Sequence, residues 1–175
     1  MFRSPLPVAH VEMNKQQTVM GNFIKELERV PWFENLGKPN APASKVKWIH
    51  DWDEWPGPED PQVGDANSRQ QLLYDEIVSN AQGELAFIEQ AWKQIHEVVL
   101  RAGASKTPYV PDKDAWYAPN SAVWHAAWTA GLVGLCLLVN RKVPDELQEQ
   151  WRWFRLGHWP CAWEGDFPDG CPVVY

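Results

Sequence analysis

Two of the ligand-type side chains near the end of the chain have a spacing that suits a metal. His158 and Cys161 stand three residues apart, which is typical of zinc ligands, and Cys171 follows ten residues later. A structural zinc site usually contains two such close pairs. Here there is one, so a fourth ligand would have to come from His125 or Asp169. We therefore predict that these side chains pack within the fold and that the protein holds no metal or other cofactor.

A second candidate is the run of His50, Asp51, Asp53 and Glu54. An imidazole beside carboxylates could bind a divalent cation or exchange protons with a substrate. If the segment is extended, however, Asp51 and Asp53 share one face while His50 lies on the other. The groups would then not converge, so a solvated acidic loop is the favoured interpretation.

Nucleophilic catalysis would need a reactive thiol beside an imidazole. The candidates are Cys136, Cys161 and Cys171, with His125 or His158 as the base. Cys136 lies in an apolar segment, which favours an inert thiol. No motif of a serine hydrolase, phosphate-binding loop, dinucleotide-binding fold or zinc protease occurs in the chain. The sequence therefore favours a protein that is not an enzyme.

The strongest functional pattern is an acidic, tryptophan-rich segment. From Asp51 to Asp65 there are six acidic residues and no Lys or Arg, which leaves only −1 of the net charge of −7 for the remainder of the chain. Tryptophan is enriched in binding hot spots, and clustered acids speed association with a basic partner. We predict a protein-binding surface formed by Trp48, Asp51, Trp52, Asp53, Glu54, Trp55, Glu59 and Asp60. The alternative is that the tryptophans pack on the fold while the acids keep the loop solvated.

An apolar stretch of eighteen residues, Ala122 to Val139, is the element against which the rest of the fold is expected to pack. Its polar side chains are His125 and Thr129, and Ser121 could cap its start. Such a helix either lies inside a protein or spans a membrane. Its many Ala and Gly residues, and an ionisable group at His125, favour a central helix of a bundle and no membrane span.

Three further segments have helical periodicity. Together with the central helix they predict a mainly α fold with a four-helix core at about 14–30, 66–102, 121–140 and 144–156. Long ordered loops rich in Pro and Trp connect the helices. Alternation around Trp48 and in the last residues of the chain suggests a small two-stranded sheet.

The central helix also provides the alternative site. Trp124, His125 and Trp128 recur along it, and His158 lies in the tail. Together they could line the pocket of a small enzyme or ligand-binding protein.

Composition sets the remaining expectations. The 175 residues suit a single globular domain, 1–175, and the 12 Trp residues are unusually many. A net charge of −7 argues against nucleic acid as a partner. The first residues lack the apolar core of a signal peptide, and the three Cys residues fit reduced thiols, so we expect a cytoplasmic protein.

A small, acidic, tryptophan-rich chain without a catalytic signature resembles, as a type, the bacterial immunity proteins. The resemblance is one of class, without a shared motif. It implies an inhibitor that covers the active site of a basic cognate toxin.

Overall fold

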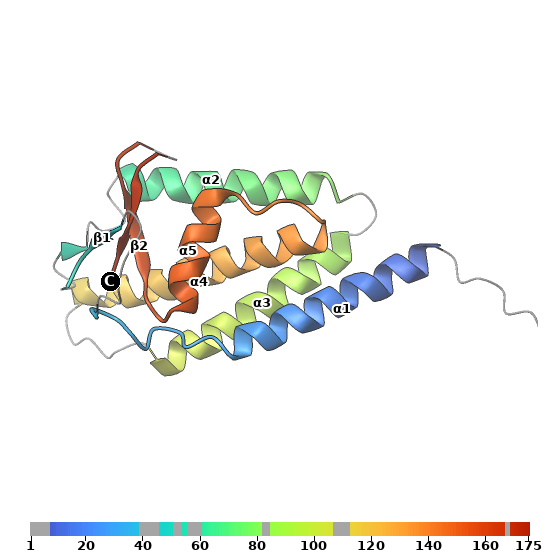
Figure 1. The fold of residues 1–175 in the computed structure, drawn as a ribbon, viewed down its shortest axis with the longest axis horizontal. Coiled ribbons are helices and arrows are strands. Elements are labelled where there is room, and N and C mark those ends of the chain that lie inside the picture. The colour runs from blue at the N-terminus through green and yellow to red at the C-terminus, as the bar shows by residue number, and fades with distance from the viewer. Residues whose placement is uncertain are drawn as a thin grey trace, which may run out of the picture.

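The computed structural model describes residues 8–38, 46–50, 54–55, 61–81, 85–106, 113–166 and 169–175. Helices dominate these ranges, and a small sheet lies at one end of them (Figure 1). In chain order the elements are α1 (Val8–Glu28), β1 (Lys47–Trp48), α2 (Pro61–Ser79), α3 (Leu85–Lys106), α4 (Lys113–Leu138), α5 (Asp145–Arg155), β2 (Pro160–Glu164) and β3 (Cys171–Val174). The mainly helical fold that the sequence predicts is confirmed.

Helix α4 is the central element, as expected from its apolar sequence. It packs against α1, α2, α3 and α5, so nearly every face of its second half is covered (Figure 1). Its buried residues include Ala126, Ala127, Ala130, Leu132, Val133, Leu135 and Cys136. Among the described helices, none has the length and apolar character needed to cross a membrane.

Helix α5 follows the predicted pattern closely. It covers Asp145–Arg155, within one residue of the expected range at each end. Asp145 and Glu146 occupy its first turn, where the helix dipole favours negative charge. Gly157, with φ of 85°, follows its end in a conformation that suits glycine. Its residues Leu147, Trp151 and Phe154 are all buried.

The single long helix predicted for 66–102 is wrong, because two helices occupy this region. Helix α2 ends at Ser79, and α3 begins at Leu85. Asn80 closes the end of α2 by donating from Nδ2 to the carbonyl of Glu76 at 3.0 Å. The apolar stripe runs through both segments because both helices bury it against α4. Periodicity alone does not reveal the break between them.

Three helices also begin earlier than predicted. Helix α1 starts at Val8, and α2 starts at Pro61, where the missing N–H of proline costs no hydrogen bond. Helix α4 starts at Lys113, so Ser121 lies inside the helix and does not cap it. A proline such as Pro119 usually indicates the boundary of a helix in a sequence. Here it lies within α4, where it removes only one backbone hydrogen-bond donor. Residues 113–120 are therefore helical despite Pro119.

The sheet has three strands, one more than the sequence predicts. Strand β3 lies in the middle, with β1 parallel on one side and β2 antiparallel on the other. Gly170 closes the β2–β3 hairpin, since a Cβ there would lie 2.0 Å from the carbonyl oxygen of Glu164. The ion pair of Lys47 Nζ with Glu164 Oε1, at 2.9 Å, links the outer strands. Strand β2 was missed because its short sequence, PCAWE, does not alternate.

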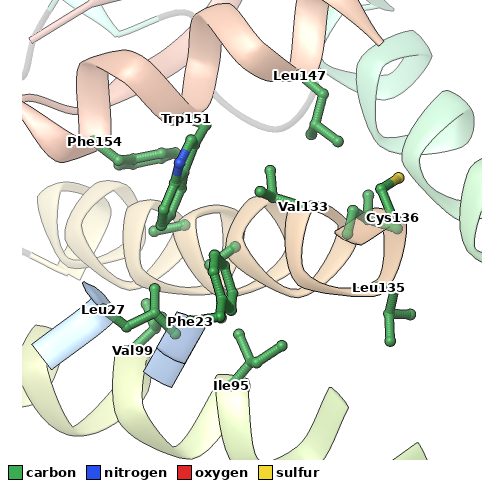
Figure 2. Packing of buried hydrophobic residues seen from close by; sticks show 14 of the residues in the cluster. Phe23, Leu27, Ile95, Val99, Val133, Leu135, Cys136, Leu147, Trp151 and Phe154 are labelled. Carbon is green, nitrogen blue, oxygen red and sulfur yellow. The ribbon is translucent and has the colours of Figure 1, made fainter. Parts of the chain in front are cut away.

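The core lies where α1, α3 and α5 meet α4. Figure 2 shows Phe23 and Leu27 of α1, Ile95 of α3 and Trp151 of α5 directed toward this junction. Gly134 of α4 makes the close approach possible, because a Cβ there would lie 2.5 Å from Ile95 Cδ1 and 2.8 Å from Phe23 Cε1.

Gly134→Ala should therefore lower the free energy of unfolding by about 1–3 kcal/mol, because the added methyl overpacks the core. Urea unfolding monitored by tryptophan fluorescence measures the change. The matched control is Gly21→Ala on α1, where nothing lies within 4 Å of the new Cβ. That variant should gain about 0.5–1 kcal/mol from helix propensity. A gain in both variants would show that α1 and α3 do not approach α4 as closely as described.

Candidate functional site

Two tryptophans of the predicted binding segment anchor it to the sheet end of the molecule. The ring of Trp48 stands edge-on to Trp153, with centroids 5.2 Å apart. Trp55 donates from Nε1 to the carbonyl of Cys161 at 3.2 Å and stacks near Trp159, with centroids 6.0 Å apart. Both side chains are partly buried. They hold the ends of the segment in place and offer a partner only part of their surface.

The structure describes only some of the acidic residues of this segment. Glu54 is exposed beside Trp55. Asp65 lies in α2 and not in the loop. The other predicted contact residues fall outside the described ranges, namely Asp51, Trp52, Asp53, Glu59 and Asp60. His50 is exposed, but Asp51 and Asp53, two of the three carboxylates proposed to act with it, lie outside the described residues.

A groove at the start of α5 is lined by further acidic side chains, which the sequence did not indicate to be neighbours. It has a volume of about 400 Å³ and is open to solvent. It is lined by Lys142, Pro144, Asp145, Glu146, Glu149, Trp163 and Asp169. We call these residues the acidic groove. The sequence placed its acids at the start of a helix and in a distant turn, and only the packing of β2 against α5 brings them together.

Three acids of this groove already have basic neighbours. Asp145 lies 3.7 Å from Lys142, and Glu149 lies 3.8 Å from Arg152. The exposed pair of Asp145 with Lys142 contributes about 0–1 kcal/mol, so a basic partner could replace it at little cost. Glu149 and Glu146 are held more firmly, because Glu149 accepts from Trp153 Nε1 at 3.1 Å and Glu146, only 17% exposed, pairs with Arg69 of α2.

Strand β2 contacts both the acidic groove and Trp55 of the predicted binding segment. Trp55 binds the carbonyl of Cys161 in β2, and Trp163 of the same strand lines the groove. Glu164, at the end of β2, holds Lys47 of β1 and raises the pKa of that lysine through a hydrogen bond and charge attraction. The sheet therefore ties the two acidic regions to the same scaffold.

Three of the four residues of the alternative pocket do come together. Trp124, His125 and Trp128 of α4 line a hollow of about 300 Å³. The facing residues, Asn67, Gln70 and Gln71, belong to α2 and were not predicted. We call this site the α2–α4 hollow. Amide residues carry no distinctive pattern in sequence, so only the packing of the two helices identifies them.

His158 is not among the residues that line the α2–α4 hollow. It is fully buried, and its ring lies edge-on to Trp48 and Trp153, with centroids 5.1 and 5.6 Å away. Burial lowers its pKa, and the nearby backbone of Asn35 opposes part of that shift. Among the described residues, none reaches either ring nitrogen in hydrogen-bonding geometry.

His125 is partly buried, and loss of solvation lowers its pKa to about 4. Its ring packs near Phe154, with centroids 6.0 Å apart. The imidazole is therefore neutral at neutral pH and can donate or accept a hydrogen bond, but it carries no charge.

Two of the three cysteines, Cys136 and Cys161, are buried thiols. Cys161 is buried, donates from Sγ to the carbonyl of Val173 at 3.4 Å, and has its pKa raised by burial. Burial also raises the pKa of Cys136. Since the thiolate is the nucleophile and the metal ligand, both are chemically quiet. Within the described residues, no three His, Cys, Asp or Glu side chains are arranged to hold a metal ion.

A third hollow, of about 440 Å³, lies between α2 and the start of α5. Its two arginines already face carboxylates: Arg69 pairs with Glu146, and Arg141 lies 3.0 Å from Glu76. Leu72 is 66% exposed at its rim. Its two arginines and two carboxylates balance each other, so this hollow favours neither an acidic nor a basic ligand.

Searches with this chain match no family model, no curated protein and no solved structure.

Proposed function

We propose that this chain is a protein-binding module that captures a basic protein partner through an acidic surface at the sheet end of the molecule. That surface comprises Trp48, Glu54, Trp55 and the acidic groove. The sequence adds Asp51, Trp52, Asp53, Glu59 and Asp60 as further candidates, which lie outside the described residues. The observation that carries the proposal is the groove itself, where four carboxylates surround an open hollow beside Trp163 with Lys142 as the one basic lining residue described.

A fixed scaffold supports this proposal. The anchoring of Trp48 and Trp55 on Trp153 and Trp159 means that the ends of the acidic segment are already ordered before a partner arrives. Ordering side chains and loops on binding costs free energy, and a surface that is held in advance avoids part of that cost.

The charge distribution supports the choice of a basic partner. Carboxylates collected on one surface attract a basic protein over a distance and raise its association rate. The biological form that we favour is an inhibitor of the immunity type, which covers the active site of a basic toxin domain. The protein encoded by the adjacent gene tests whether this chain is an inhibitor of that type. A toxin domain there supports it, and a metabolic operon contradicts it.

Neutralising the acidic groove should slow capture of that basic domain by at least about tenfold at low salt and flatten the salt dependence of the rate. The groove variant is Asp145→Asn, Glu149→Gln and Asp169→Asn. A second variant neutralises Asp51, Asp53, Glu59 and Asp60 in the same way. Stopped-flow measurements at several salt concentrations give the rates, and the melting temperature of both variants should stay within a few degrees of the parent.

The matched control removes three exposed acids on α1 and α3 that do not line the groove. It carries Glu28→Gln, Glu89→Gln and Glu97→Gln. If the control slows capture as much as the groove variant does, net charge alone steers the partner and the proposed surface is wrong.

A further inference from the structure

The α2–α4 hollow has two walls of different chemistry. Trp124 and Trp128 stand one helical turn apart on α4 and form an aromatic wall. Asn67, Gln70 and Gln71 of α2 form a facing amide wall. Ligand sites typically combine apolar and aromatic surface with a few placed polar groups, and this hollow has both.

The aromatic wall is held rigidly from behind. Trp128 lies edge-on to Trp92 and Tyr74, with centroids 4.9 and 5.9 Å away. Trp92 reaches this position because residue 131 is glycine: a Cβ there would lie 2.6 Å from Trp92 Cζ3. Trp124, by contrast, is 48% exposed. Trp124 therefore offers exposed indole surface to a ligand, next to Trp128, whose ring is held by its neighbours.

The amide wall presents acceptors. Gln70 donates from Nε2 to Thr129 Oγ1 at 3.4 Å and to Gln150 Oε1 at 3.3 Å. Gln71 donates from Nε2 to Asp75 Oδ1 at 3.0 Å. Gln70 donates from its amide nitrogen to two partners and Gln71 to one, so these residues can offer a ligand their carbonyl oxygens and one N–H of Gln71. A ligand that brings several hydrogen-bond donors suits this wall.

The described lining carries no formal charge at neutral pH, since His125 is neutral there. A charged ligand would lose water without meeting a counter-charge, which is unfavourable. A wholly apolar ligand would leave amide carbonyls unpaired on desolvation, which costs about 1–3 kcal/mol per group. The lining therefore suits an uncharged ligand with one apolar face and several donors.

We propose that the α2–α4 hollow binds a neutral saccharide. The C–H face of the sugar ring packs on Trp124, and its hydroxyl groups donate to the carbonyl oxygens of Gln70 and Gln71. The site shares no residue with the acidic groove, so this inference stands or falls independently of the proposed function.

The shape of the hollow favours a sugar over a planar heterocycle. Both tryptophans lie on one wall, so a flat aromatic ring would stack on one side only and leave its own edges with few partners. A sugar ring has hydroxyls around its rim, and these can reach the amide wall while one face meets the indole. The volume of about 300 Å³ lies at the lower end of ligand pockets, which fits one ring.

Saturation-transfer NMR and calorimetry test the proposal with methyl glycosides of glucose, galactose, mannose and N-acetylglucosamine. At least one should bind with a Kd on the order of 1 mM, since an open hollow buries only part of a small ligand. The strongest transfer should be to the ring protons of a single face. Trp124→Ala should weaken binding at least tenfold, and Trp124→Phe should weaken it less.

The control is Leu72→Ala, which alters an exposed α2 residue outside the hollow and should leave sugar binding unchanged. Circular dichroism checks that each variant remains helical. Three outcomes overturn the proposal: no glycoside binds at about 10 mM; binding survives Trp124→Ala in a folded protein; or adenosine or tetramethylammonium binds at this site in preference to every sugar.

Discussion

Phe154→Ala should lower the free energy of unfolding by about 3–5 kcal/mol. The side chain is fully buried on α5, and its ring packs near Trp32, Phe33 and His125 at centroid distances of 5.9, 6.2 and 6.0 Å. These partners come from the segment after α1 and from α4, so no single neighbouring element can move to refill the space. The loss therefore combines the transfer free energy of the ring with the cost of a cavity.

Chemical denaturation followed by circular dichroism measures this loss. The matched control is Leu156→Ala, two residues later, where the side chain is 40% exposed. It should change stability by about 0.5 kcal/mol or less. A small effect at Phe154 would mean that α5 does not pack on Trp32 and α4 as described.

Acidification from pH 6.5 to 5 should destabilise the protein, by up to about 2 kcal/mol through His125, whose pKa in the folded chain is about 4. Burial lowers the pKa of His96, His125 and His158, so each binds a proton more weakly in the folded than in the unfolded chain. Below the unfolded pKa near 6.5 the unfolded state therefore holds more protons. Stability is fully present above that pH and is lost as the pH falls toward the folded pKa, which is about 4 for His125.

Urea unfolding at pH 8, 6.5, 5.5 and 5 measures this dependence before most carboxylates titrate. His125→Gln should make the curve shallower by about 1–2 kcal/mol across the window, because it removes an imidazole that binds a proton more weakly in the folded chain than in the unfolded chain. Parallel curves for the parent and His125→Gln would show that this imidazole is not desolvated in the fold.

The sequence predicted those features that depend on local pattern. The apolar surface of α4 required burial on all sides, and α1, α2, α3 and α5 supply that burial. The acids at the start of α5 and Gly157 after its end located this helix within one residue at each boundary. Periodicity and capping act within a few turns of chain, so they are readable without knowledge of the partners.

The break between α2 and α3 was not readable in this way. Both helices carry an apolar stripe because both pack on α4, so the stripe continues past Ser79 into Leu85 and beyond. Periodicity reports that a face is buried and gives no information about the element that covers it.

The candidate sites depended still more on tertiary structure. The spacing of Trp124, His125 and Trp128 indicated one wall of a pocket, but the amides of α2 that face it became recognisable only once the helices were packed. Trp48 and Trp55, which the sequence placed among partner contacts, lie against Trp153 and Trp159 because the sheet brings these distant segments together. The chain by itself determined which residues could bind, whereas packing decided which of them still face solvent, because a side chain can serve a partner only with surface that the fold has not already covered.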